Sequence, residues 1–182
     1  MKPSVFPILA ACLAFSGAAQ AADRVIEIRL LKTSGAAPTE ATLRSIVEDP
    51  GAQAAAVTSK ALSSEGSVKI EGTTPFRFAS EYTMAGEPSS FETTDLGTRA
   101  TVATSMGADG KLSLELDLES KIADTPVVYE VDGVQVTMPV FHRVASGDAR
   151  LQVTPGEWAF LSARTGEVPM HWAIRVTDAG GK

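Results

Sequence analysis

The feature that most constrains the fold is the alternation of leucines with acidic or small polar residues in LSLELDLES, residues 112–120. Successive side chains of a β-strand point to opposite faces of a sheet, so this period of two predicts a strand with one buried and one solvated face. The leucines are expected in the core. Glu115, Asp117 and Glu119 then form a row on the other face, which is either a wet surface or a set of functional carboxylates.

The same alternation occurs in the first expected strand of the domain, and one helical pattern follows it. In RVIEIRLLK, residues 24–32, the isoleucines and Leu30 fall on one face, which predicts a half-buried strand. The segment EATLRSIVED, residues 40–49, spaces its apolar residues three and four apart and predicts a helix. Thr39 stands at the N-cap position, and Pro50-Gly51 ends the pattern.

After this helix the sequence predicts only strands and turns. Two hairpins stand out: one joins residues 98–106 to 111–120, and one joins 127–131 to 134–144 across Asp132-Gly133, a dipeptide that favours tight turns. A loop is expected over 84–90 and a chain reversal at Gly147-Asp148. The remaining expected strands cover residues 54–62, 67–70, 76–82, 150–153, 158–163 and 171–177. The predicted fold class is mainly β, with antiparallel sheets packed as one domain and a single short helix near the N-terminus.

The N-terminal residues 1–22 match a secretory signal peptide. Lys2 is followed by a short apolar stretch and by the small-residue pattern Ala19-Gln20-Ala21. Export to the periplasm is therefore expected, with residues 23–182 as one mature domain. Leu9-Ala10-Ala11-Cys12 also resembles a lipobox, so lipidation of Cys12 stays open as an alternative. Because Cys12 is the only cysteine, the mature domain has no disulfide framework.

The charge balance narrows the class of partners. The formal net charge of the chain is −6, and removal of Lys2 with the signal peptide, which carries no acid, makes it −7. An acidic domain of this kind is not expected to bind nucleic acid or to attach to anionic lipid through a basic patch. Proteins are the expected partners, including further copies of the chain, and association with the outer membrane stays open.

Few residues of the sequence are candidates for catalysis or metal binding. His142 and His171 are the only histidines, neither has a second ligand at metal-binding spacing, and no nucleotide or nucleophile motif occurs. An enzyme would use Glu115, Asp117 or Glu119 with His142. Three acids opposite four leucines are more typical of a sheet with one solvated face. The sequence therefore predicts a protein that is not an enzyme, with no catalytic, cofactor-binding or metal-binding residues.

Four segments, in order, resemble the C-terminal core of bacterial secretins, the outer-membrane channels of type II and type III secretion and of type IV pili. RVIEIRLLK stands where the family has a first strand, and residues 72–75 resemble its G-x-x-x-P. The stretch 95–120 follows the family's "d-x-G-x-x-L-x-v-x-P-x-i-x-x-d-g-x-v-x-L-x-i-x-x-e-x-S", and MPVFHRVASGDARLQVTPGEWAFLSARTG, residues 138–166, follows the next segment.

The chain also departs from the secretin pattern. The family's V-P-x-x-x-x-I-P-x-x-G-x-L-F signature is absent after Gly166, and VATSM at 102–106 lacks the proline of "L-x-v-x-P". The resemblance therefore implies a secretin-like fold reduced to its sheet scaffold, acting by protein binding or assembly in a secretion or pilus system. An independent periplasmic binding or structural β protein, unrelated to secretion, is the alternative.

Overall fold

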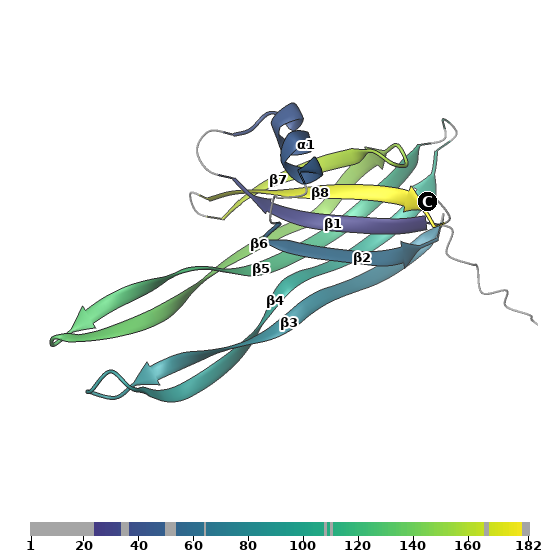
Figure 1. Cartoon of the computed structure of the whole chain (residues 1–182). Helices are drawn as coiled ribbons and strands as arrows, with labels where there is room; N and C mark the ends of the chain where they lie inside the picture. The colour runs from purple at the N-terminus through teal and green to yellow at the C-terminus, as the bar shows by residue number, and fades with distance from the viewer. Residues whose placement is uncertain are drawn as a thin grey trace, which may run out of the picture.

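The computed structural model describes residues 24–33, 37–49, 54–63, 65–107, 109, 111–165 and 168–179. The predicted signal peptide and Cys12 lie outside these ranges. Within them the fold is mainly β, with antiparallel strands and one short helix, as the sequence predicts (Figure 1). The elements are β1 (Arg24–Lys32), α1 (Glu40–Glu48), β2 (Ala56–Leu62), β3 (Gly66–Tyr82), β4 (Pro88–Met106), β5 (Leu112–Val131), β6 (Val134–Val153), β7 (Trp158–Thr165) and β8 (Val168–Asp178).

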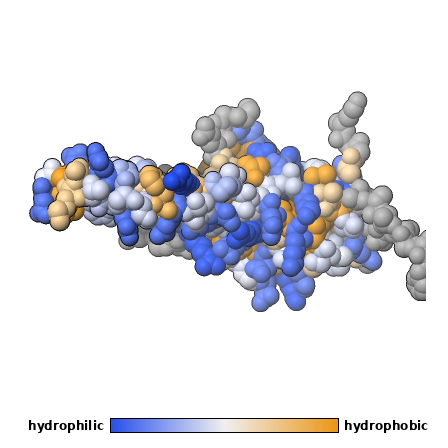
Figure 2. Space-filling model, turned by 90° about the horizontal axis from the view of Figure 1, so that it is seen from below, coloured by the Kyte–Doolittle hydropathy of each residue, from blue (hydrophilic) through white to orange (hydrophobic). Residues whose placement is uncertain are grey.

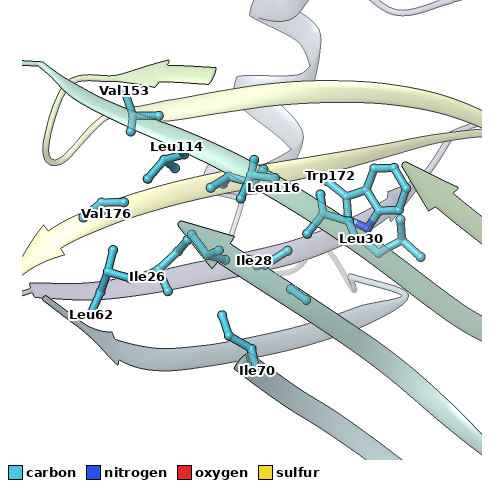
Figure 3. Packing of buried hydrophobic residues seen from close by; sticks show 14 of the residues in the cluster. Ile26, Ile28, Leu30, Leu62, Ile70, Leu114, Leu116, Val153, Trp172 and Val176 are labelled. Atoms are coloured by element: carbon cyan, nitrogen blue, oxygen red, sulfur yellow. The ribbon is translucent and has the colours of Figure 1, made fainter. Parts of the chain in front are cut away.

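The strands form two four-stranded antiparallel sheets that pack face to face. Their orders are β2-β1-β8-β7 and β3-β4-β5-β6. The two inner faces share one apolar core, in which Trp172 lies beside Leu30 (Figure 3). The predicted core face of β5 is confirmed, because Leu112, Leu114, Leu116 and Leu118 are all buried there. We call this packed part, without the hairpin ends described below, the sandwich body.

One buried polar contact links the two sheets inside the core. Trp172 on β8 donates its Nε1–H to the Ser120 hydroxyl oxygen on β5, at 3.1 Å. The hydroxyls of Ser120 and Thr98 are also hydrogen-bonded, at 2.8 Å. A buried donor without a partner would cost free energy, so this contact favours one relative placement of the sheets.

Helix α1 covers the outer face of the β2-β1-β8-β7 sheet. Its predicted N-cap is confirmed, since the Thr39 hydroxyl oxygen accepts a hydrogen bond from the Thr42 backbone N–H at 3.2 Å. The helix buries Leu43 and Val47 in a second apolar cluster together with Leu31, Trp158 and Ala173. Strand β8 is therefore covered on both faces, which explains its continuous run of buried residues. No helix in the described ranges is long and apolar enough to cross a membrane.

Strands β3 to β6 are longer than the sequence analysis predicts. The hairpin turn at Asp132-Gly133 is confirmed, with φ of 53° and 79°. The expected reversal at Gly147-Asp148 is wrong: β6 runs on to Val153. The ladder slips there instead, between the pairs that involve Leu116 and Leu118, and Asp148 has a φ of 54°. The turn-forming residues form a β-bulge, so the strand continues past them.

Two hairpin ends project from the sandwich body (Figure 1). The β4–β5 ladder runs from the Met106–Leu112 pair to the Gly97–Lys121 pair, whereas the β3–β4 and β5–β6 ladders continue beyond it. We call residues 73–96 the β3–β4 arm and residues 122–142 the β5–β6 arm. The expected loop at 84–90 is the tip of the first arm: Thr83 to Glu87 make the turn, and β4 already begins at Pro88.

Candidate functional site

The acid row lies on the open outer face of the β3-β4-β5-β6 sheet. Glu115 forms an ion pair with Arg150 at 2.9 Å, and Glu119 forms one with Arg143 at 2.9 Å. More than half of each arginine side chain is exposed, so these pairs contribute little to stability. The predicted solvated face is confirmed, and Glu115 and Glu119 on it are paired with arginines.

His142 does not join the acid row. It pairs with Ile122 in the β5–β6 ladder, and Ile122 is buried on the inner face of the sheet, opposite to the row. The His142 Nε2 atom lies 2.6 Å from an oxygen of Asp124. Among the described residues, no group of three or more histidine, cysteine, aspartate and glutamate side chains gathers in a metal-binding arrangement.

Asp124 ties the base of the β5–β6 arm to the sandwich body. Its carboxylate accepts a hydrogen bond from Lys32 Nζ, at the end of β1, at 2.6 Å. The Lys32 ammonium, followed by the Thr125 backbone N–H and His142, holds the pKa of Asp124 far below its usual range. The sequence patterns do not predict this cluster. The register set by the Asp132-Gly133 turn could have found it, because counting back along both strands brings residue 124 close to residue 142.

His171 has a structural place in the sandwich body. Its ring is buried, with Nδ1 at 2.8 Å from the Ser162 hydroxyl and Nε2 at 3.1 Å from the Thr33 hydroxyl. Burial lowers the pKa of His171, which favours the neutral ring. The contacts of His171 therefore indicate a neutral ring that is hydrogen-bonded at both nitrogens and joins three chain segments.

Gly97 marks the point at which the sheet divides into the two arms. Its φ is +129°, and a Cβ atom there would lie 2.0 Å from the carbonyl oxygen of Gly72 on β3. Across the division, Lys121 donates a hydrogen bond to the Thr94 hydroxyl at 2.5 Å and lies 4.9 Å from the centre of the Phe141 ring. A glycine is therefore required where β4 leaves β5.

The two arms lean on each other along one side. Phe78 of the β3–β4 arm contacts Phe141 of the β5–β6 arm, with ring centres 5.1 Å apart, and Phe76 contacts the same ring at 6.1 Å. Nearer the tips, the Tyr82 hydroxyl donates a hydrogen bond to the carbonyl oxygen of Thr137. An isolated two-stranded hairpin is marginally stable in water, so this contact supports both arms.

Another face of the β5–β6 arm is apolar, and its β5 residues are exposed. Residues directly opposite in an antiparallel ladder share a face, and the pairs nearest the tip are Val131–Val134, Tyr129–Val136 and Val127–Met138. Alternation along β6 places the even-numbered residues on the same side of the strand as Val144, which is buried in the core. The core-facing surface of the sheet thus continues onto the arm, past the end of the other sheet.

On this face the β5 residues are exposed, whereas their β6 partners are half-buried and the tip of the β3–β4 arm packs on Val134 at Gly86. The exposed fractions of Val127, Val128, Tyr129 and Val131 are 40%, 57%, 52% and 59%. Phe76, Met84 and Phe91 on the β3–β4 arm are exposed as well, whereas the sandwich body exposes only Val57 and Met106 among its described large apolar residues. Figure 2 shows hydrophobic atoms at the outer end of the arms, between hydrophilic ones. The arms are the part of this surface best suited to bind another molecule.

Comparisons with protein-family models, with curated proteins and with solved structures find no match to this chain. The resemblance to secretins therefore stays a prediction from the sequence.

Proposed function

We propose that this protein is an exported, secretin-like domain that binds other proteins through its β5–β6 arm, in a secretion or pilus system, and that it does not act by catalysis. The observation that carries the proposal is the exposed apolar row on β5 of that arm, formed by Val127, Tyr129 and Val131. Soluble proteins rarely leave such a face exposed unless it contacts a partner.

The acid row supports a binding role rather than a catalytic one. A glycosidase uses two carboxyl groups that flank the bound substrate, and one of them is buried so that it keeps its proton. Here Glu115 and Glu119 are partly exposed and paired with arginines, and His142 is directed to Asp124 instead. The row is better suited to keep the sheet soluble and to resist pairing with other sheets.

Photo-crosslinking in the cell envelope tests the proposal. A photoreactive amino acid at Tyr129, on the arm, is compared with one at Asp117, on the exposed outer face of the body. We expect adducts with another protein chain from position 129 and none from position 117. Equal adducts from both positions, or none from position 129, would contradict a binding role for the arm.

The identity of the crosslinked chain separates the two versions of the function. A component of a secretion or pilus system, or a second copy of this chain, supports the secretin-like version. A partner outside such systems supports an independent periplasmic binding protein. The departures at residues 102–106 and after Gly166 keep this second version in view, because the family patterns differ there.

A further inference from the structure

One strand edge of the β5–β6 arm has no neighbour in the described chain. The β4–β5 ladder stops at the Gly97–Lys121 pair, so β5 has no partner on its β4 side from Val127 to Val131. In a hairpin with a two-residue turn, the flanking residues form a hydrogen-bonded pair and the pattern then alternates. Val127, Tyr129 and Val131 therefore direct their backbone groups toward β6. Val128 and Glu130 direct theirs to the open edge.

The β3 and β6 edges of this sheet carry features that block strand pairing. On β3, the carbonyl oxygen of Lys69 accepts a hydrogen bond from Lys60 Nζ at 2.7 Å, and Pro75 has no N–H to donate. On β6, Thr137 accepts a hydrogen bond from Tyr82, and Pro139 follows two residues later. Proteins commonly protect edge strands with proline, lysine and capped carbonyls. The segment from Val127 to Val131 contains neither proline nor lysine.

The charges near this edge restrict what can bind there. Glu130 and Asp132 flank the tip of the β5–β6 arm, and both are exposed. From Arg77 outward on the β3–β4 arm and from Val127 outward on the β5–β6 arm, Arg77 is the one basic residue. The same two stretches carry five exposed acids, which are Glu81, Glu87, Glu92, Glu130 and Asp132. This surface would repel an anionic membrane and a second acidic tip, and it would attract a basic partner.

We infer that the edge from Val127 to Val131 binds an extended segment of another protein by strand addition, and that this segment alternates apolar with basic residues. Backbone hydrogen bonds would form with Val128 and Glu130. The apolar residues of the segment would extend the face of Val127, Tyr129 and Val131, and its basic residues would lie near Glu130 and Asp132. The inference rests on the proposed function and names the edge and the chemistry of the partner.

The test uses a synthetic peptide of about eight residues, the length of an ordinary strand, that alternates lysine and valine. Its binding to the purified protein is measured by fluorescence anisotropy, beside a glutamate–valine peptide of equal length. We expect the lysine–valine peptide to bind more tightly by about tenfold or more, because each well-placed pair of opposite charges and each backbone hydrogen bond adds to affinity. Equal affinities, or tighter binding of the glutamate–valine peptide, would overturn the inference.

Two substitutions at one rung of the ladder locate the edge. Val128→Pro removes an outward N–H from the open edge, and Thr137→Pro removes the outward N–H of its ladder partner on the opposite edge. We expect Val128→Pro to weaken the lysine–valine peptide about tenfold and Thr137→Pro to leave it unchanged. A peptide N-methylated at alternate residues gives the same test without changing the protein: it should lose binding, and retained binding would overturn strand addition.

Other occupants of the edge give separate outcomes. Binding of the wild-type protein to phosphatidylcholine vesicles that Val128→Pro abolishes, or self-association in sedimentation that it abolishes, would overturn the assignment of a basic partner segment. Failure of the strand-addition inference can also be told apart from failure of the proposed function. If crosslinks from position 129 persist in Val128→Pro, the arm still binds proteins and only strand addition is wrong; if position 129 never crosslinks in the cell, the function itself fails.

Discussion

The sandwich body and the β5–β6 arm share two strands and one alternating face, but only the body covers that face. In the body, Leu114 and Leu116 pack against the opposite sheet and are fully or almost fully buried. On the arm, Val127, Tyr129 and Val131 continue the same face but are 40%, 52% and 59% exposed. The alternation stabilises the fold in the body, whereas on the arm it leaves the apolar side chains of β5 exposed.

The largest expected effect separates body from arm by the cost of deleting an apolar side chain. Leu114→Ala should lower the free energy of unfolding by about 2–5 kcal/mol, because it leaves a cavity in the core. Val131→Ala, on the exposed arm, should change it by about 0.5 kcal/mol or less. Urea denaturation measures both. Similar losses at the two positions would show that the arm contributes to the core.

Gly97→Ala tests the point where the two regions separate. The added Cβ would collide with the Gly72 carbonyl oxygen in a backbone conformation unsuited to alanine, so we expect a loss of about 1–3 kcal/mol in the free energy of unfolding. Gly147→Ala is the matched control, because no atom lies within 4 Å of a Cβ built there. A neutral Gly97→Ala would mean that the division does not need a glycine.

Ser120→Ala tests the polar link inside the body. It leaves the Trp172 N–H and the Thr98 hydroxyl without this buried partner, which should cost about 1–3 kcal/mol of unfolding free energy. Ser89→Ala, at an exposed position on the β3–β4 arm, should change the unfolding free energy by about 0.5 kcal/mol or less. Thermal unfolding of the two variants gives the comparison, and equal midpoints would contradict it.

The smallest effect concerns the contact that joins arm and body. The folded protein holds the pKa of Asp124 below its ordinary value of 3.8, so the stabilising contribution is present above that pH and is lost as the pH falls toward the folded pKa. The stability difference between wild type and Asp124→Asn should therefore stay constant above about pH 5 and shrink as the pH falls below about 4. Lys32→Ala in the Asp124→Asn background should add little. A difference that stays constant with pH would exclude the ionised contact.

The body could be predicted from the sequence better than the arms. In the body, LSLELDLES and the Thr39 cap each have a local physical cause, and each is found in the structure. On the arms, the Asp132-Gly133 turn is found for the same reason, but the strand lengths are not. The length of β5 was not found, because Asp124-Thr125-Pro126 interrupts the apolar alternation as a turn would. A bulge between Asp124 and Val127 lets the strand continue instead.

The candidate site was missed for a related reason. The sequence shows which residues alternate, but not where the opposite sheet ends. Val127, Tyr129 and Val131 follow the same pattern as core residues, so sequence reasoning assigns them to a strand without predicting that the face is bare. Which residues remain uncovered depends on the length of β1 and β8 relative to β5 and β6, which is set by tertiary packing.

Amide hydrogen exchange of the isolated protein, read residue by residue along β5, tests most directly whether the arm is a folded hairpin with one open edge. We predict slow exchange for Leu114 and Leu116, intermediate exchange for the amides of Val127, Tyr129 and Val131, and fast exchange for Val128 and Glu130. Protection of Val128 and Glu130 equal to that of Leu116 would contradict the account, because it would mean that the edge is already covered.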